Sequence, residues 1–373
     1  MQQPSASRER PRSVTMRDVA EYLDVSKQTV SAVINNKPGI PAGTRGRVLA
    51  AIEELGYRPD YTARSLRTGR TGTIALFVTD ISNPVFSMLA SVAEDYAYAA
   101  SYTLVLYNTR DDPQRERSYV DSAIQRSVDG ALFVAARDDT IAVESLEAAG
   151  LPVVVMDRLP RSYIGPSVSL DNGLAGELAA RHLLMLGHTR LAHIAGPAAV
   201  HISEERLRGF CGVVEADGLA EDICIERAGG WQVECGYSAM ERLLAQPTDF
   251  TAVLAAGDLL AIGAARALRE AGIRIPEDVS LMGIDDIDLA AFTHPPLTTV
   301  SQSLTQMATK AAQMLLELVG GQEPEQRRVR IVPQLIVRHS TAPPPAPGSA
   351  GRSGRPGDVQ VGNMPATTLR ASG

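Results

Sequence analysis

The chain has 373 residues, 45% of them hydrophobic and 21% charged, which is ordinary for a soluble globular protein; at about 150 residues per domain, this length predicts two to three domains. No apolar run reaches about 18 residues, so we expect no membrane-spanning helix, and the charged N-terminal stretch lacks the apolar segment of a secretion signal. The three cysteines form no C-x-x-C pair, which excludes a disulfide framework or a four-cysteine zinc site and favours the reducing cytoplasm.

Charge is unevenly distributed along the chain. The formal net charge is −7, yet residues 1–70 hold 12 Lys and Arg against 7 Asp and Glu, a net of +5, which leaves −12 for the remaining 303 residues. A basic head on an acidic body is typical of a head that meets phosphates. Charge alone leaves open the alternative that a short segment is basic without binding nucleic acid.

Residues 15–58 predict three short helices, which we call the head. Thr15 and Asp18 form a T-x-x-D pattern that begins the first helix, Ser26 caps the second, and the third covers 44–55. Two helices joined by a tight turn and supported by a third form a helix-turn-helix, which places its second helix in the major groove of DNA.

The outward face of the second helix predicts contacts with bases. Gln28 can pair with adenine, Lys27 can reach guanine or a phosphate, and Ala32 can contact a thymine methyl group. Ser26 and Thr29 suit phosphates, which fix register without reading sequence. Any exposed helix carries such residues, so DNA binding is favoured only by their combination with the turn, the caps and the basic charge. The predicted DNA-contacting residues of the head are Thr15, Ser26, Lys27, Gln28, Thr29, Ser31, Ala32 and Asn35.

From residue 72 onward, which we call the body, short β-rich runs alternate with helical segments. Strands are predicted at 73–79, 103–107, 130–135 and 152–156, and in a second series at 190–195, 223–227, 251–256 and 279–284. Helices are predicted at 85–100, 113–127, 173–186, 203–216, 234–245, 258–271 and 303–319. This alternation predicts an α/β fold with two similar lobes, each a doubly wound parallel sheet with helices on both faces.

Polar and aromatic side chains follow several of these strands. Asp80, Asp157 and Asp285 come directly after three of them, Arg206 lies early in a helix, and Trp231 is the only tryptophan. Open parallel sheets bind ligands beyond the carboxyl ends of their strands. Carboxylates accept hydrogen bonds from hydroxyls, arginine donates them, and an aromatic ring packs against the C–H face of a sugar. We therefore expect a cleft for a small polyhydroxylated ligand; the alternative is a purely structural role for Asp80 and Asp157.

The stretch VTMRDVAEYLDVSKQTVSAVINNKPG and the residues that follow it, up to 76, resemble the head and hinge of the lac-repressor/gal-repressor family of bacterial transcription regulators. The resemblance extends over residues 15–340. It implies that segment 60–68 forms a hinge helix on DNA, with Ala63 and Leu66 at the minor groove and Leu66 wedged between bases. Ala32 stands where many relatives carry arginine, which alters base preference by about 1–3 kcal/mol per lost bidentate pair.

The body resembles the sugar-sensing core of the same family, which is similar to periplasmic sugar-binding proteins. The stretch SLDNGLAGELAARHLLMLGH (169–188) matches the motif between the lobes, and PPLTTVSQ (295–302) matches the crossing back into the first lobe. Gly257 stands where the family usually has asparagine, which removes an amide from the cleft. The resemblance places effector-binding residues at Asp80, Phe86, Asp157, Arg206, Trp231, Asp285 and Gln302.

These observations predict the domain limits. We expect residues 15–58 to bind DNA and 59–71 to form the hinge or linker. The first lobe is expected to comprise 72–168 with 299–322, and the second lobe 169–298 with 323–340. We expect disorder in residues 1–14 and in the tail, 341–373, which is rich in Pro, Gly and Ser.

The predicted function is a homodimeric, cytoplasmic transcription regulator, expected to be a repressor that grips a pseudo-palindromic operator on double-stranded DNA and responds to a sugar. The alternative is a ligand-binding receptor of periplasmic type without DNA function. No phosphate-binding loop, nucleophile elbow or H-E-x-x-H motif occurs, so we expect neither an enzyme nor a cofactor, metal or membrane partner.

Overall fold

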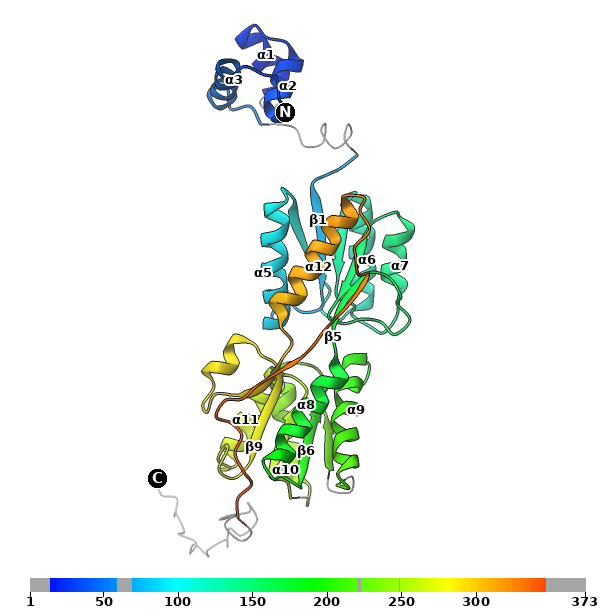
Figure 1. Ribbon diagram of the computed structural model, residues 1–373, viewed down its shortest axis with the longest axis vertical. Helices are drawn as coiled ribbons and strands as arrows, with labels where there is room; N and C mark the ends of the chain where they lie inside the picture. The colour runs from blue at the N-terminus through cyan, green and yellow to red at the C-terminus, as the bar shows by residue number, and fades with distance from the viewer. Residues whose placement is uncertain (1–13, 59–68, 220–222, 248, 347–373) are drawn as a thin grey trace, which may run out of the picture. The chain divides into compact units, whose positions relative to one another are not determined.

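The computed structural model describes residues 14–58, 69–219, 223–247 and 249–346 (Figure 1). The proposed hinge segment 60–68, with Ala63 and Leu66, therefore lies outside the described residues. Most of the two terminal segments also lie outside them. The chain divides into two compact units, Met1–Gly72 and Thr73–Gly373, and each is described by itself.

The first unit contains the three predicted helices. They are α1 (Met16–Leu23), α2 (Lys27–Ile34) and α3 (Ala42–Glu54). The capping box between Thr15 and Asp18 is present at α1, and the Ser26 hydroxyl accepts the Thr29 amide at the start of α2. Asp24 ends α1 in the left-handed conformation, which makes the tight turn. The buried core is built by Val19, Ala20, Val30, Val33, Val48, Ala51 and Tyr57.

The second unit contains two six-stranded sheets. The first lobe has the order β11 (Arg328–Ile331), β5 (Ser167–Leu170), β4 (Val153–Met156), β3 (Gly130–Phe133), β1 (Thr73–Val78), β2 (Thr103–Asn108), with every pair parallel. The second has the order β12 (Gln334–Ile336), β10 (Thr298–Ser301), β9 (Ser280–Asp285), β8 (Ala252–Ala255), β6 (Leu191–Ala195), β7 (Ile223–Arg227). All neighbours in it are parallel except β12, which runs antiparallel to β10.

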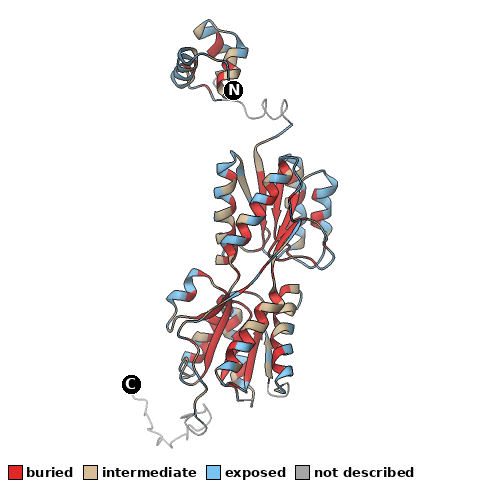
Figure 2. Ribbon diagram, in the orientation of Figure 1, coloured by how far each residue is buried: buried red, intermediate tan, exposed pale blue. Residues whose placement is uncertain are grey.

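Helices cover both sheets, as continuous apolar strands require. The first lobe carries α5 (Pro84–Ala99), α6 (Pro113–Gln125), α7 (Ile141–Ala148) and α12 (Leu304–Val319). The second carries α8 (Asn172–Met185), α9 (His201–Ala216), α10 (Val233–Ala245), α11 (Asp258–Glu270) and the short 3₁₀ helix η2 (Asp288–Phe292). The central strands are buried, whereas the outer helix faces are exposed (Figure 2).

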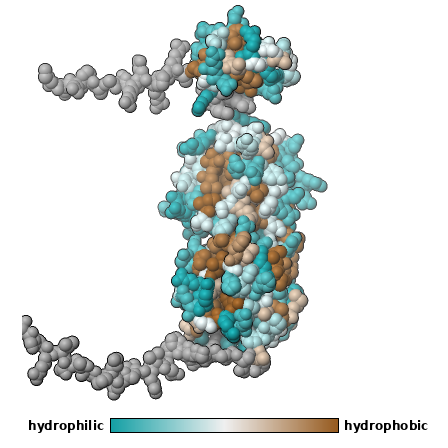
Figure 3. All heavy atoms as spheres, turned by 90° about the vertical axis from the view of Figure 1, so that its left-hand side faces the viewer, coloured by the Kyte–Doolittle hydropathy of each residue, from teal (hydrophilic) through white to brown (hydrophobic). Residues whose placement is uncertain are grey.

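Apolar side chains also reach the surface of the body. Figure 3 shows the face that carries α5, where such side chains gather in both lobes. Tyr98 on α5 is 78% exposed and Phe292 on η2 is 84% exposed. Exposed apolar patches of this kind mark protein interaction surfaces.

The predicted lobe limits are wrong in three places. Segment 323–340 was expected in the second lobe, but β11 within it pairs with β5 of the first sheet. Conversely, β10 pairs with β9 of the second sheet although 299–322 was expected in the first lobe. β5 also keeps residues up to Leu170 in the first sheet. Short strands with little apolar character, such as RVRI in β11, carry no signal of which sheet edge they will join.

Candidate functional site

The recognition helix α2 presents part of the predicted DNA-contacting set to solvent. Ser26, Lys27 and Gln28 are exposed, and so is Thr15 before α1. The remaining predicted residues, Thr29, Ser31, Ala32 and Asn35, are half-buried. The outward orientation of the helix N-terminus suits entry into a groove, where the first residues of a recognition helix reach base edges.

Several of these polar side chains also hold the helix itself. The Ser26 hydroxyl lies 2.9 Å from the Thr29 hydroxyl, and the Thr15 hydroxyl donates to Asp18 at 2.8 Å. The Asn35 amide donates to the Ser31 carbonyl at 2.6 Å. Caps of this type stabilise a helix by about 1 kcal/mol. Residues that the sequence predicts to contact DNA therefore also hold the helices in place.

Arg45 on α3 was not singled out from the sequence. Its guanidinium donates to the Asn36 side-chain oxygen at 2.8 Å and to the Lys37 carbonyl at 2.7 Å. Asn36 has a φ of 49°, a conformation that needs support in a residue other than glycine. Arg45 thus fixes the loop that follows the recognition helix.

A cleft of about 190 Å³ lies between the two lobes of the body. Three of the predicted effector residues, Asp80, Phe86 and Trp231, line it. The other lining residues are Ser82, Asn83, Asp111 and Arg158 from the first lobe, and Gln232, Val233, Glu234 and Leu259 from the second. Asn83 caps α5 through a bond from the Val85 amide, which fixes the loop that carries Asp80 and Phe86.

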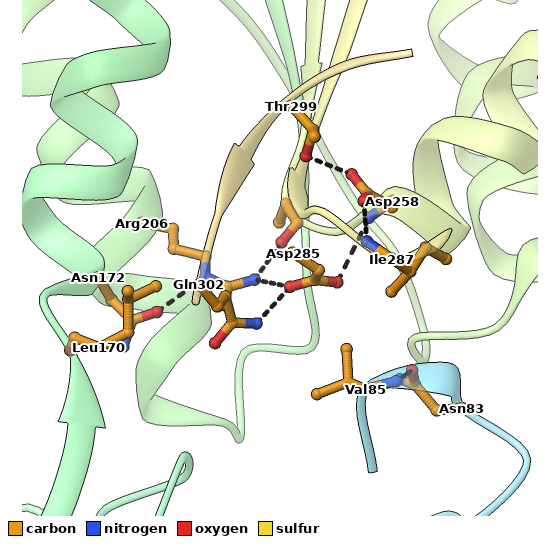
Figure 4. Close-up of polar contacts among 11 residues, drawn as sticks. Asn83, Val85, Leu170, Asn172, Arg206, Asp258, Asp285, Ile287, Thr299 and Gln302 are labelled. Atoms are coloured by element: carbon orange, nitrogen blue, oxygen red, sulfur yellow. Dashed lines mark hydrogen bonds and ion pairs between the residues drawn. The ribbon is translucent and has the colours of Figure 1, made fainter. Parts of the chain in front are cut away.

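A buried polar network connects three more predicted residues (Figure 4). The Arg206 guanidinium, whose side chain is 1% exposed, donates to Asp285 at 3.3 Å and to the Ala256 carbonyl at 2.5 Å. Its Nε donates to Asn172 at 2.9 Å. The Gln302 amide donates to the same Asp285 oxygen at 2.5 Å. One arginine therefore connects β8, β9, α8 and the crossing after β10.

The buried carboxyl groups have perturbed titration. Burial raises the pKa of Asp285, an effect that the Arg206 charge opposes. Burial likewise raises the pKa of Asp157, opposed by Arg158 and Arg206. Asp258 lies next in the network, where it accepts hydrogen bonds from Thr299 at 2.6 Å and from the Ile287 amide at 3.0 Å; burial raises its pKa too. Groups of this kind are concentrated at functional sites.

Backbone strain coincides with two of these carboxylates. Asp157 has a φ of 62° and Asp285 a φ of 134°, both unfavourable for a residue with a side chain. Each follows or ends a buried strand, β4 or β9. Residues held in such conformations cost about 1–3 kcal/mol and cluster at ligand sites. The surrounding fold must therefore hold both carboxylates in place at their strand ends.

Arg158 forms the wall of the cleft on the first lobe. Its guanidinium bonds Asp111 at 2.6 Å and lies over the rings of Phe86 and Trp231, 5.3 Å and 5.8 Å from their centroids. Cation–π contacts of this type orient the guanidinium. Two aromatic rings from opposite lobes thus flank the same charge.

The indole of Trp231 fits its place because Gly196 lacks a side chain: a Cβ atom there would lie 2.5 Å from indole Cη2. A Cβ atom on Gly257 would lie 3.1 Å from Asp285 Oδ2, which is a tight contact, and 3.5 Å from indole Cε3, which is an ordinary one. Gly257, predicted from the sequence to remove an amide, therefore also leaves room for the Asp285 carboxylate.

Four buried polar atoms, two in the cleft lining and two in the buried network, have no hydrogen-bond partner among the described residues. They are Arg206 Nη2, Gln302 Oε1, Trp231 Nε1 and Arg158 Nε. Leaving a buried donor or acceptor unpaired costs about 1–3 kcal/mol each. Three donors and one acceptor match a ligand with several hydroxyl groups, because each hydroxyl both donates and accepts.

Of the seven predicted effector residues, three line the cleft, and the prediction missed other lining residues. The remaining four, Asp157, Arg206, Asp285 and Gln302, are buried and do not line it. Asp111 follows β2 just as Asp80 follows β1, so the same strand-end rule would have found it. Gln232, the N-cap of α10, and Glu234, in the first turn of that helix, follow Trp231 closely in the chain. Asn172 had no signal beyond its position in the motif between the lobes.

The described residues contain no group of three His, Cys, Asp or Glu side chains arranged to hold a metal ion. His188, for example, is buried and bonds the Thr251 hydroxyl at 2.8 Å and the Ala342 carbonyl at 2.8 Å. In the same part of the chain, no helix has the length and apolar character to span a bilayer.

Comparison with known proteins gives matches to both units. Residues 15–60 match the model for bacterial regulatory proteins of the lacI family, and residues 180–341 match that for a periplasmic binding protein-like domain. The ribose operon repressor of Escherichia coli (strain K12) is 34% identical over 327 residues, which cover 87% of this chain and 99% of the relative.

Two solved structures are similar along most of their length. The lac repressor dimer bound to operator and the anti-inducer ONPF is 28% identical, with a TM-score of 0.81 over 89% of this chain and 100% of that chain. A LacI family transcriptional regulator from Enterococcus faecium with bound ribose is 31% identical, with a TM-score of 0.67 over 73% of this chain and 99% of that chain.

Proposed function

Because the chain belongs to the lacI family of bacterial regulatory proteins, we propose that it is a cytoplasmic transcription repressor, not an enzyme, whose DNA affinity is controlled by a neutral sugar bound between its lobes. The observation that carries this proposal is the cleft lined by Phe86 and Trp231, whose indole lies against Arg206 of the buried Arg206–Asp285–Gln302 network. The receptor alternative has no support, since the lacI model matches residues 15–60.

The charge of the cleft supports a neutral ligand. Asp80, Asp111 and Glu234 line it, and Asp157 and Asp285 lie beside them, whereas Arg158 and Arg206 are the cations, each already paired with a carboxylate. An anionic ligand would meet this excess of carboxylates without an unpaired cation to bind it. A free pentose or hexose fits better than its phosphate ester or a sugar acid.

The position of the cleft between the lobes allows ligand binding to be coupled to DNA binding. A ligand that contacts both Asp80 in the first lobe and Trp231 in the second makes all its contacts only when the lobes are closed. It therefore favours the closed arrangement by its differential affinity. A coupling of about 1–3 kcal/mol changes operator affinity by about 5–150-fold. Segment 59–71, with Ala63 and Leu66, is the proposed link to the minor groove.

A homodimer is proposed as the DNA-binding species. The known lac repressor structure is a dimer on its operator, and the exposed apolar residues on α5 and η2 provide a surface for a second copy. Two heads then read the two halves of a pseudo-palindromic site. Thr15, Ser26, Lys27, Gln28, Thr29, Ser31, Ala32 and Asn35 are the proposed contacts of each head.

The experiment is a thermal-shift screen of the full chain against neutral pentoses and hexoses, their phosphate esters, and nucleosides. A ligand that binds the folded state raises the melting temperature by mass action. We expect shifts with neutral monosaccharides only. A shift with phosphate esters alone would refute the neutral-sugar assignment, and no shift with any sugar would refute the sensor itself.

A further inference from the structure

Three side chains form a polar bridge between the lobes, apart from the cleft. The Arg161 Nε, in the loop after β4, lies 2.9 Å from His201 Nδ1, at the start of α9. The same Nε lies 3.0 Å from Asp138 Oδ2, in the loop after β3. We propose that Asp138, Arg161 and His201 form a latch that holds the two lobes closed and thereby sets how readily the cleft opens.

Hydrogen bonds orient the members of the latch. A guanidinium N–H can only donate, so His201 Nδ1 is the acceptor of the bond from Arg161 Nε. His201 Nε2 faces Glu205, one turn further along α9, at 3.3 Å. Asp138 is held in turn, since its other oxygen accepts the Arg161 backbone amide at 2.8 Å. Each member is therefore oriented by a second bond, as a pre-organised contact requires.

The packing around the latch shows that the lobes meet here. Residues of both lobes, Arg137 and Leu159 on one side and Val200 and Ile202 on the other, enclose a residual space of only about 10 Å³. Arg158 lines both this space and the sugar cleft. Arg158 also lies over the Trp231 ring of the second lobe, so separation of the lobes at the latch separates the two sides of the cleft.

The latch lies away from the segments that connect the two lobes. The chain crosses between the lobes after β5, after β10 and between β11 and β12, all strands at one edge of their sheets. His201 follows β6, which lies four strands away from β12 in the second sheet. A contact distant from the crossings resists a hinge motion that bends the crossings themselves.

The single tryptophan provides a test that needs no ligand and no DNA. Trp231 is 9% exposed in the closed cleft, so acrylamide reaches its indole mainly when the lobes open. Arg161 is 61% exposed, which limits the latch to the strength of a surface pair. We expect Arg161→Ala and His201→Ala each to raise the quenching constant about twofold to fivefold over a low wild-type value. The double variant should not exceed the larger single effect.

Two matched variants complete the experiment. His201→Asn keeps an acceptor at the position of Nδ1 and should retain wild-type quenching. Arg181→Ala removes an equally exposed arginine, 61%, from an ion pair within α8, and should change nothing. Circular dichroism verifies that each variant is folded. If His201→Ala does not fold, the comparison of Arg161→Ala with His201→Asn is sufficient to test the latch. Wild-type quenching in Arg161→Ala, an equal rise in Arg181→Ala, or strong quenching of the wild type would overturn the latch.

Discussion

Replacing Arg206 by alanine is the sharpest perturbation of the buried network. The change removes bonds to Asn172, Ala256 and Asp285, and leaves the Asp285 carboxylate buried with the Gln302 amide as its remaining side-chain partner among the described residues. Breaking a buried ion pair by removing one partner costs about 3–5 kcal/mol of unfolding free energy. We expect a loss of that size, together with loss of the response to sugar.

The loss should depend on pH in a defined direction. Burial already raises the pKa of Asp285 above that of a carboxyl in an unfolded chain, about 3.9. A group that binds protons more tightly in the folded state contributes stability that is lost as pH rises through its folded pKa. Without the Arg206 charge the pKa of Asp285 rises further, and that of Asp157 with it. The variant should therefore be closest to wild type in acid and furthest from it above neutral pH.

Chemical unfolding of both proteins at a series of pH values measures this directly. Arg208→Ala is the matched control, because Arg208 lies on the same helix but is exposed. A difference in unfolding free energy below about 1 kcal/mol, or one that grows as the pH falls, would refute the role given to Arg206. Operator affinity of the folded variant without sugar should match wild type.

Three further predictions address the head and the cleft. Gln28→Ala should relax base preference at one operator position by about 1–3 kcal/mol while sugar binding is unchanged, as measured by anisotropy on single-base operator variants; a uniform loss over all sequences would make Gln28 a phosphate contact. Ser26→Ala should cost about 1 kcal/mol of head stability by loss of the cap, as measured by thermal unfolding, and unchanged melting would exclude the cap. Gly257→Asn places a Cβ 3.1 Å from Asp285 Oδ2 and 3.5 Å from the indole, so it should change the ranking of sugars in the thermal-shift screen, whereas an unchanged ranking would place Gly257 outside the ligand site.

Local signals made the head predictable from sequence. Capping at Thr15 and Ser26, the turn at Asp24 and the spacing of Val19, Val30 and Val33 are all encoded within a few residues. The helices and the turn of the head depend on residues close together in the sequence, so the sequence alone predicts them. The third helix began at Ala42, two residues before the expected start, because Pro41 is its N-cap and is followed at once by helix.

The cleft was predictable only in part. The rule that ligands bind beyond strand ends found Asp80, which lines the cleft, without knowledge of the sheet order. Asp157 and Asp285, chosen by the same rule, are buried and do not line it. Asn172 joins the network through a bond to Arg206, 34 residues away, and no local pattern marks that pairing. The same holds for β11, which finds its partner β5 more than 150 residues earlier in the chain.

The most direct measurement of the proposed link between DNA and sugar is operator binding by the full chain, followed by fluorescence anisotropy at fixed salt. The titration uses a labelled pseudo-palindromic operator selected from a library, with and without the neutral monosaccharide that gives the largest thermal shift. We expect tight, sequence-dependent binding whose affinity changes about 5–150-fold when the sugar is present. Binding that ignores both DNA sequence and sugar would contradict the coupling between head and cleft.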